Sequence, residues 1–151
     1  MTTGLLAPAA RRIRPTGRRP RLRLDRRIVG CFYLFTGGIH VGIVAADPQF
    51  YRHFADGALA GVIRSGWRDV FMAHPAGWGL LLAAGELALG LLLLRGGRWA
   101  RLGWAGVIGF HLALMSFGWG FWLWSVPALA LLVPAAGRDL RQRSTRQPQH
   151  H

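Results

Sequence analysis

Four apolar stretches, separated by short polar or glycine-rich segments, set the pattern of the chain. They cover residues 28–46, 77–94, 102–116 and 120–136. About twenty apolar residues, rising about 1.5 Å each as a helix, cross the hydrocarbon core of a bilayer. The pattern therefore predicts an all-α protein, an integral membrane four-helix bundle. The last stretch is short, and we expect Pro127 to bend it because proline removes a backbone hydrogen bond.

Helical spacing divides each of the first two stretches into a small or polar face and a large apolar face. The small or polar faces are Gly30, Tyr33, Gly37 and His40 in the first stretch, and Gly79, Ala83, Glu86 and Gly90 in the second. The opposite faces are Phe32, Phe35, Ile39 and Ile43, and Leu80, Leu87, Leu91 and Leu94. Because small residues allow helices to approach closely, we expect the first set to face the bundle and the second to face lipid.

The segment between the first two spans is amphipathic rather than uniformly apolar. Asp47 followed by Pro48 is typical of a helix start, with Asp as the N-cap and Pro at the first helical position. Apolar residues then recur at helical spacing over 48–63 among polar ones. This pattern predicts an interfacial amphipathic helix between spans 1 and 2, and Trp67, Val70 and Phe71 are spaced to continue it to Pro75.

Both ends of the chain are strongly basic. The formal net charge of +13 comes from arginine, since the sequence contains no lysine, and nine of the nineteen arginines lie in residues 1–27. We interpret 1–27 as a disordered arm and 137–151 as a basic tail, with 28–136 as the membrane domain. Arginines beside a span favour anionic lipid headgroups. Nothing in these segments indicates a nucleic-acid-binding fold, so nucleic acid is not an expected partner.

The distribution of arginine also predicts the orientation of the spans. The arm, the 95–101 turn and the tail from Arg138 carry nine, three and four arginines, whereas the 47–76 segment carries three and the 117–120 turn none. Cytoplasmic loops of membrane proteins are enriched in Arg and Lys. We therefore expect a multi-pass protein with both termini in the cytoplasm.

One carboxylic acid, Glu86, lies in the middle of the second span. An acid at this depth costs about 2.5 to 3.5 kcal/mol on insertion scales, so it must face something other than lipid. At about 1.5 Å per residue, His40, Glu86 and His111 lie roughly 10, 13 and 9 Å below the outer ends of their spans. These three residues, with Tyr33 and Thr36 one turn further along the His40 face, form the candidate site. Two roles for Glu86 stay open: internal hydrogen bonding, or handling of a proton, ion or cofactor.

The residues argue against two kinds of chemistry. The single cysteine, Cys31, excludes an intramolecular disulfide and any CxxC site. Two histidines and one carboxylate could ligate a metal, but no HxxxH or ExxH spacing places two ligands on one helix. A metal site is therefore not expected.

Several of these residues together resemble the DoxX-like family of small four-span bacterial membrane proteins. The resemblance covers residues 27–135 and rests on Arg27, Gly30, Gly37, Gly38 and His40 around the first span, on GELALGLLLL over 85–94, and on Arg98 and Arg101. It implies a bacterial cytoplasmic membrane protein that partners an oxidoreductase, either a quinone-linked thiosulfate-oxidising enzyme or an oxidative-stress complex. A quinone would then be reached through the partner. Some relatives use cysteine pairs, which this chain lacks.

Three functions remain open from the sequence. The first is a DoxX-like membrane subunit that is either noncatalytic alone or completes a quinone-side site together with a partner. The second is a small transporter or proton pathway using Glu86 and the histidines. The third is a structural or assembly protein. The surroundings of Glu86 discriminate among them: an apolar slot favours a quinone or lipid, a water-filled opening favours transport, and a sealed network favours structure.

Overall fold

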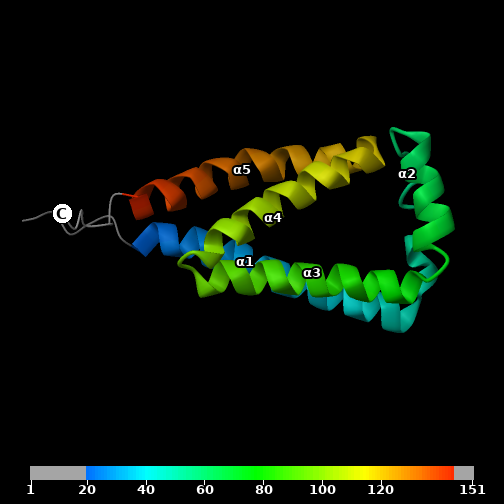
Figure 1. Ribbon diagram of the computed structural model, residues 1–151, viewed down its shortest axis with the longest axis horizontal. Coiled ribbons are helices and arrows are strands. Elements are labelled where there is room, and N and C mark those ends of the chain that lie inside the picture. The colour runs from blue at the N-terminus through cyan, green and yellow to red at the C-terminus, as the bar shows by residue number, and fades with distance from the viewer. Residues whose placement is uncertain (1–19, 145–151) are drawn as a thin grey trace, which may run out of the picture.

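The computed structural model describes residues 20–144, with side chains over residues 24–141. Its elements are α1 (Pro20–Ala46), η1 (Pro48–His53), α2 (Gly61–Gly66), η2 (Trp67–Phe71), α3 (Pro75–Arg95), α4 (Trp99–Leu114), η3 (Met115–Phe117) and α5 (Trp119–Ser144) (Figure 1). No strand occurs in this part of the chain. Within it, α1, α3, α4 continued by η3, and α5 are each long and apolar enough to cross a membrane. The all-α, four-helix prediction is confirmed.

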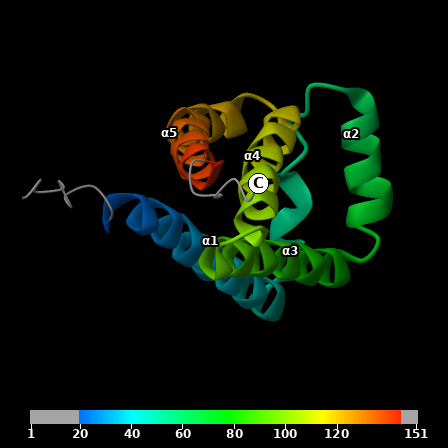
Figure 2. The ribbon, with the colours of Figure 1, turned by 60° about the vertical axis from the view of Figure 1, so that its left-hand side comes forward.

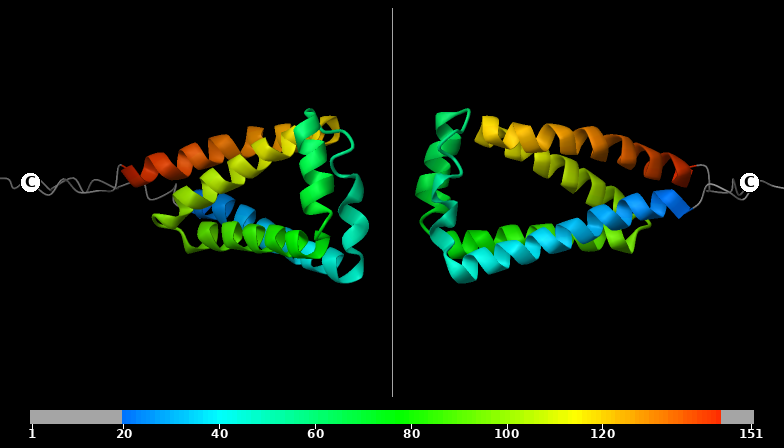
Figure 3. Two further views of the ribbon diagram at one scale, coloured as in Figure 1. Left: turned by 45° about the vertical axis from the view of Figure 1, so that its right-hand side comes forward. Right: turned by 180° about the vertical axis from the view of Figure 1, so that it is seen from behind.

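The four long helices form a wedge made of two pairs. Helix α1 lies along α3, and α4 lies beside α5; the pairs meet at one end and separate at the other (Figures 1 and 3). The connector, residues 47–74, joins α1 to α3 and stands across the wide end, with α2 at its outer edge (Figure 2). Both ends of the described chain lie at the narrow end.

Glycines hold α1 and α3 in close contact. A Cβ added at Gly90 would lie 2.7 Å from the carbonyl oxygen of Gly30, so no larger residue fits at this crossing. The predicted small face of α3 is buried, as expected. The prediction that the opposite face meets lipid is only partly right. Leu80 and Leu91 are exposed, but Leu87 packs over Gly37 and Leu94 packs over Gly30. The reason is that α3 has neighbours on two sides, so its buried arc is wider than one stripe.

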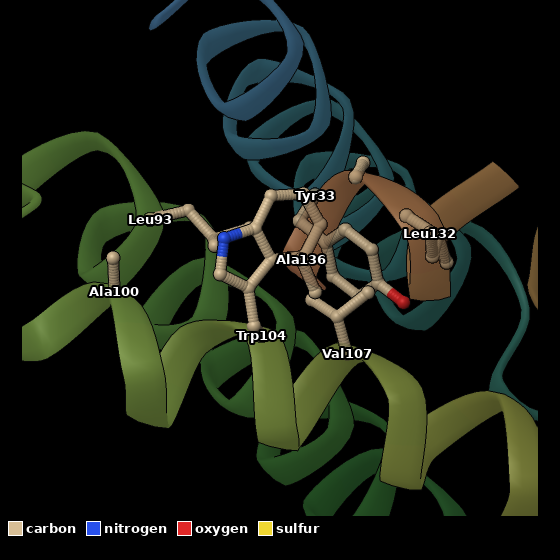
Figure 4. Close-up of a cluster of buried hydrophobic side chains, with 8 residues drawn as sticks. Tyr33, Leu93, Ala100, Trp104, Val107, Leu132 and Ala136 are labelled. Carbon is tan, nitrogen blue, oxygen red and sulfur yellow. The ribbon is translucent and has the colours of Figure 1, made fainter. Parts of the chain in front are cut away.

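Most of the buried apolar side chains of the described residues lie in one cluster at the narrow end. Its core draws residues from all four long helices: Tyr33, Leu93, Ala100, Trp104, Val107, Leu132, Ala135 and Ala136 (Figure 4). The Trp104 indole Nε1 donates a hydrogen bond to Asp139 Oδ2 at 3.1 Å, and Arg26 Nη1 lies 3.8 Å from Asp139 Oδ1. These contacts tie α1, α4 and α5 together. We call Arg26, Trp104 and Asp139 the narrow-end cluster.

The boundaries of the outer helices differ from the sequence prediction. Helix α1 begins at Pro20 rather than at residue 28, and α5 continues past Pro127 and Pro134 to Ser144, so the fourth span is long rather than short. Ion pairs between these extensions, Asp25 with Arg138 at 3.4 Å and Arg26 with Asp139, favour the added helical turns. The rest of the predicted arm, 1–19, and the end of the tail, 145–151, lie outside the described residues.

The connector is helical, as predicted, but it is divided. The Asp47 side chain caps its start by accepting a hydrogen bond from the Gln49 amide at 2.8 Å. The helix then ends at His53, and the chain turns before α2 begins at Gly61. Contacts with the α4–α5 turn cause the break: the Leu59 amide donates to the Ser116 carbonyl at 3.1 Å, and the Gly57 carbonyl lies against Gly118.

Candidate functional site

A cavity of about 570 Å³ lies between the two helix pairs, toward the wide end of the wedge. Residues of all four long helices and of the connector line it, and most of them are aromatic or aliphatic. Its walls include Phe32 of α1 and Trp124 of α5, whose exposed fractions are 41% and 57%. The cavity therefore reaches the outside of the bundle between α1 and α5.

All five candidate residues from the sequence lie on the wall of this one cavity. They are Tyr33, Thr36 and His40 on α1, Glu86 on α3 and His111 on α4. Close contacts at glycines of α1 and α3 fix how these two helices are rotated about their axes, and α4 diverges from that pair. The candidate side chains therefore point toward the space between the helices. The cavity is thus mainly apolar, with polar side chains grouped on the α1, α3 and α4 walls.

Glu86 and His40 form a close pair. His40 Nε2 lies 3.6 Å from Glu86 Oε1, and on the other side of the ring Nδ1 lies 2.7 Å from the Tyr51 hydroxyl. The two rings of His40 and Tyr51 also stack, with centroids 5.7 Å apart. A continuous series of titratable groups therefore runs from Tyr51 in the connector, through His40, to Glu86 in the second span.

Two buried polar atoms beside this series have no hydrogen-bond partner among the described residues. They are Oε2 of Glu86 and the hydroxyl of Tyr33. The Thr36 side chain lies within interaction distance of the Glu86 carboxyl group, but its hydroxyl donates its proton to the Tyr33 carbonyl oxygen at 3.3 Å. An unpaired buried polar group costs about 1 to 3 kcal/mol, and native proteins contain few of them.

His111 makes no hydrogen bond or ion pair with Glu86, although both of these described residues line the cavity. Its Nδ1 lies 3.4 Å from the Ser125 hydroxyl of α5, and both residues are buried. The three groups therefore do not form one directly bonded triad. Instead, a coupled pair of Glu86 and His40 lies on the α1–α3 side, and His111 with Ser125 lies on the α4–α5 side.

Sequence reasoning missed Tyr51 and Ser125. Tyr51 is fully buried, packed between the rings of Phe54 and Phe71, because the divided connector turns it inward rather than along the interface. No periodicity in 48–63 predicts that orientation. Ser125 could have been identified from the sequence, because it is the only hydroxyl-bearing residue within the predicted span 120–136.

The environment of Tyr51 alters its acidity. Burial raises the pKa of the Tyr51 hydroxyl above its ordinary value of 10.0, and the nearby Glu86 carboxylate raises it further. The hydroxyl therefore stays protonated at neutral pH and remains able to donate a hydrogen bond to His40.

A second cavity, also of about 570 Å³, lies on the other side of Glu86, between α3 and α4. Trp78 and Leu89 of α3 and Gly106 of α4 line it. Five residues line both cavities, so the Glu86 carboxyl group lies between them: Phe71, Leu82, Glu86, Phe110 and Ala113.

Within residues 20–144, no group of three or more His, Cys, Asp or Glu side chains is placed to hold a metal ion. The thiol of Cys31 is exposed on α1, away from these cavities. Comparisons of the chain with protein-family models, with curated proteins and with solved structures found no match.

Proposed function

We propose that this chain is a DoxX-like membrane subunit that gives an oxidoreductase partner a quinone-side ligand site within the bilayer. The observation that carries the proposal is the aromatic cavity with Glu86 and His40 on its wall and with the exposed rings of Phe32 and Trp124 at its outward side, between α1 and α5. Ligand sites are typically apolar hollows with a few convergent polar groups. A water-lined pathway would have more polar walls, and a purely structural network would pair its polar atoms.

The subunit holds and orients the ligand, and the partner carries out the redox chemistry. The chain has one cysteine and so no cysteine pair of its own. The proposal places the protein in the bacterial cytoplasmic membrane with both termini in the cytoplasm. The arginines at the narrow end then meet anionic headgroups of the inner leaflet.

The experiment that tests this function starts from the native complex. We expect the wild-type chain, gently solubilised and purified, to bring down oxidoreductase subunits identified by mass spectrometry and a quinone identified in the lipid extract. Glu86→Leu inserts and folds, because it removes an acid from the membrane interior, but loses the quinone. Asp69→Asn, a change to an exposed acid of the connector, is the matched control and retains it.

Two outcomes would count against the proposal. A wild-type preparation that contains neither oxidoreductase subunits nor quinone would contradict the proposed function. A Glu86→Leu protein that keeps as much quinone as the Asp69→Asn protein would show that the cavity wall does not hold the ligand.

A proton pathway is the second candidate function, and the series Tyr51, His40, Glu86 favours it. In proteoliposomes with an imposed pH gradient, such a pathway gives a proton flux that Glu86→Gln abolishes, since an amide hydrogen-bonds but does not titrate. Flux that persists in Glu86→Gln would eliminate this candidate.

A further inference from the structure

We infer that the cavity ligand carries a hydroxyl group that binds between the Tyr33 hydroxyl and Oε2 of Glu86. The inference deepens the proposed function and rests on it only in taking the cavity as a ligand site. It names the chemical class of the ligand: a membrane-dissolved phenol or alcohol with an apolar body.

The first argument is the position of the two unpaired atoms. Tyr33 and Glu86 come from different helices, their exposed fractions are 2% and 4%, and both line the same cavity. Each atom is buried without a hydrogen-bond partner among the described residues. Two such atoms on one cavity wall indicate that a ligand supplies the missing bonds.

The second argument is which head group satisfies both atoms. His40 Nε2 lies 3.6 Å from Oε1, which leaves Oε2 for the ligand; Oε2 accepts a hydrogen bond when Glu86 is a carboxylate and can donate one when it is a carboxylic acid. The Tyr33 hydroxyl both donates and accepts. A ligand hydroxyl also does both, so its single oxygen pairs with Tyr33 and with Oε2 in either form. A carbonyl only accepts and leaves Oε2 of a carboxylate unpaired, and an ammonium only donates and leaves the Tyr33 proton unpaired.

The third argument concerns the body of the ligand and its route. The cavity walls beyond Tyr33 and Glu86 are largely aromatic, and the volume of about 570 Å³ accommodates a ring with part of a chain. The rings of Phe32 and Trp124 stack at 6.3 Å across the opening between α1 and α5. Both side chains also face outward, so the opening leads into lipid rather than water. An apolar body that partitions into the bilayer fits this route.

A hydroquinone and an isoprenoid alcohol share this chemistry, and binding measurements distinguish them. The test uses the full chain in lipid nanodiscs and four probes: decylhydroquinone kept reduced, the corresponding quinone, its dimethyl ether, and farnesol. We expect decylhydroquinone to bind about tenfold or more tightly than the quinone or the dimethyl ether, neither of which donates a hydrogen bond.

Variants separate a binding role of Tyr33 from a structural one. Tyr33→Phe should weaken decylhydroquinone binding about tenfold and leave the thermal midpoint of the ligand-free protein unchanged or higher, because it removes an unpaired buried hydroxyl.

A second variant tests the entry route between α1 and α5. Phe32→Ala should change the association rate of decylhydroquinone. Phe35→Ala is the matched control, because Phe35 is an exposed phenylalanine of the same helix that does not line the cavity.

The outcomes distinguish this inference from the proposed function. Equal binding of quinone and hydroquinone, or unchanged binding in Tyr33→Phe, overturns the hydroxyl inference while leaving a quinone-side function standing. Binding of farnesol without either quinone form supports the hydroxyl and overturns the quinone-side function. Binding of none of the four probes overturns both. A lowered midpoint of ligand-free Tyr33→Phe assigns the hydroxyl a structural role and also overturns the inference.

Discussion

The polar side-chain atoms described inside this bundle fall into two groups according to whether each atom has a partner. His111 with Ser125, and His40 with Tyr51, have partners on a neighbouring element and fix how those elements pack. Glu86 Oε2 and the Tyr33 hydroxyl have none among the described residues. Because exposure to lipid is costly for all of them, burial alone does not distinguish structural from ligand-binding groups, whereas pairing does.

Tyr51 links the protein's stability to pH. Its raised pKa means that the folded protein keeps the phenolic proton after the unfolded chain has lost it. Stability is therefore insensitive to this group well below pH 10 and falls as the pH rises above about 10. We expect thermal midpoints in detergent, measured from about pH 8 to about pH 11, to fall less steeply for Tyr51→Phe than for wild type. Parallel curves would contradict this assignment.

At the scale of elements, the four spans and the helical character of the connector were predictable, and the path of the connector was not. Apolar length identifies a span locally, and the candidate residues share a cavity because a polar residue in a span must turn away from lipid. The path of the connector depends on remote contacts, such as Leu59 with Ser116, that no local pattern encodes. The position of Trp104 in the core was equally unpredictable from local sequence. Its indole donates a hydrogen bond to Asp139, a residue of the predicted tail.

Gly118 joins the connector to the turn between α4 and α5. It has a φ of 107°, where side chains are disfavoured, and a Cβ there would collide with the Gly57 carbonyl. We expect Gly118→Ala to lower the free energy of unfolding by about 1 to 3 kcal/mol and to increase protease cleavage within residues 54–60. Gly66→Ala is the control, because Gly66 is helical and nothing lies within 4 Å of its added Cβ. Equal cleavage of both variants would contradict a docking role for Gly118.

For the whole molecule, the four candidate spans among the described residues place both ends of the described chain on one side. The described chain begins and ends at the narrow end, where most arginines of residues 24–141 also lie (Figure 1). We expect a reporter that is active only in the periplasm to be inactive when fused after His151 and active when inserted after Gly66 in the connector. The reverse pattern would invert the orientation and place the wide end in the cytoplasm.

The wedge itself has a mechanical consequence for the surrounding bilayer. The helix pairs converge at the narrow-end cluster and separate toward the connector, so the bundle is wider at one end of its spans than at the other (Figure 3). Such a conical inclusion pushes lipids apart unequally. The elastic energy of a flat membrane around it is relieved when the membrane bends so that the leaflet at the wide end becomes convex. Many copies at moderate density would therefore gather where the bilayer is already curved in that sense.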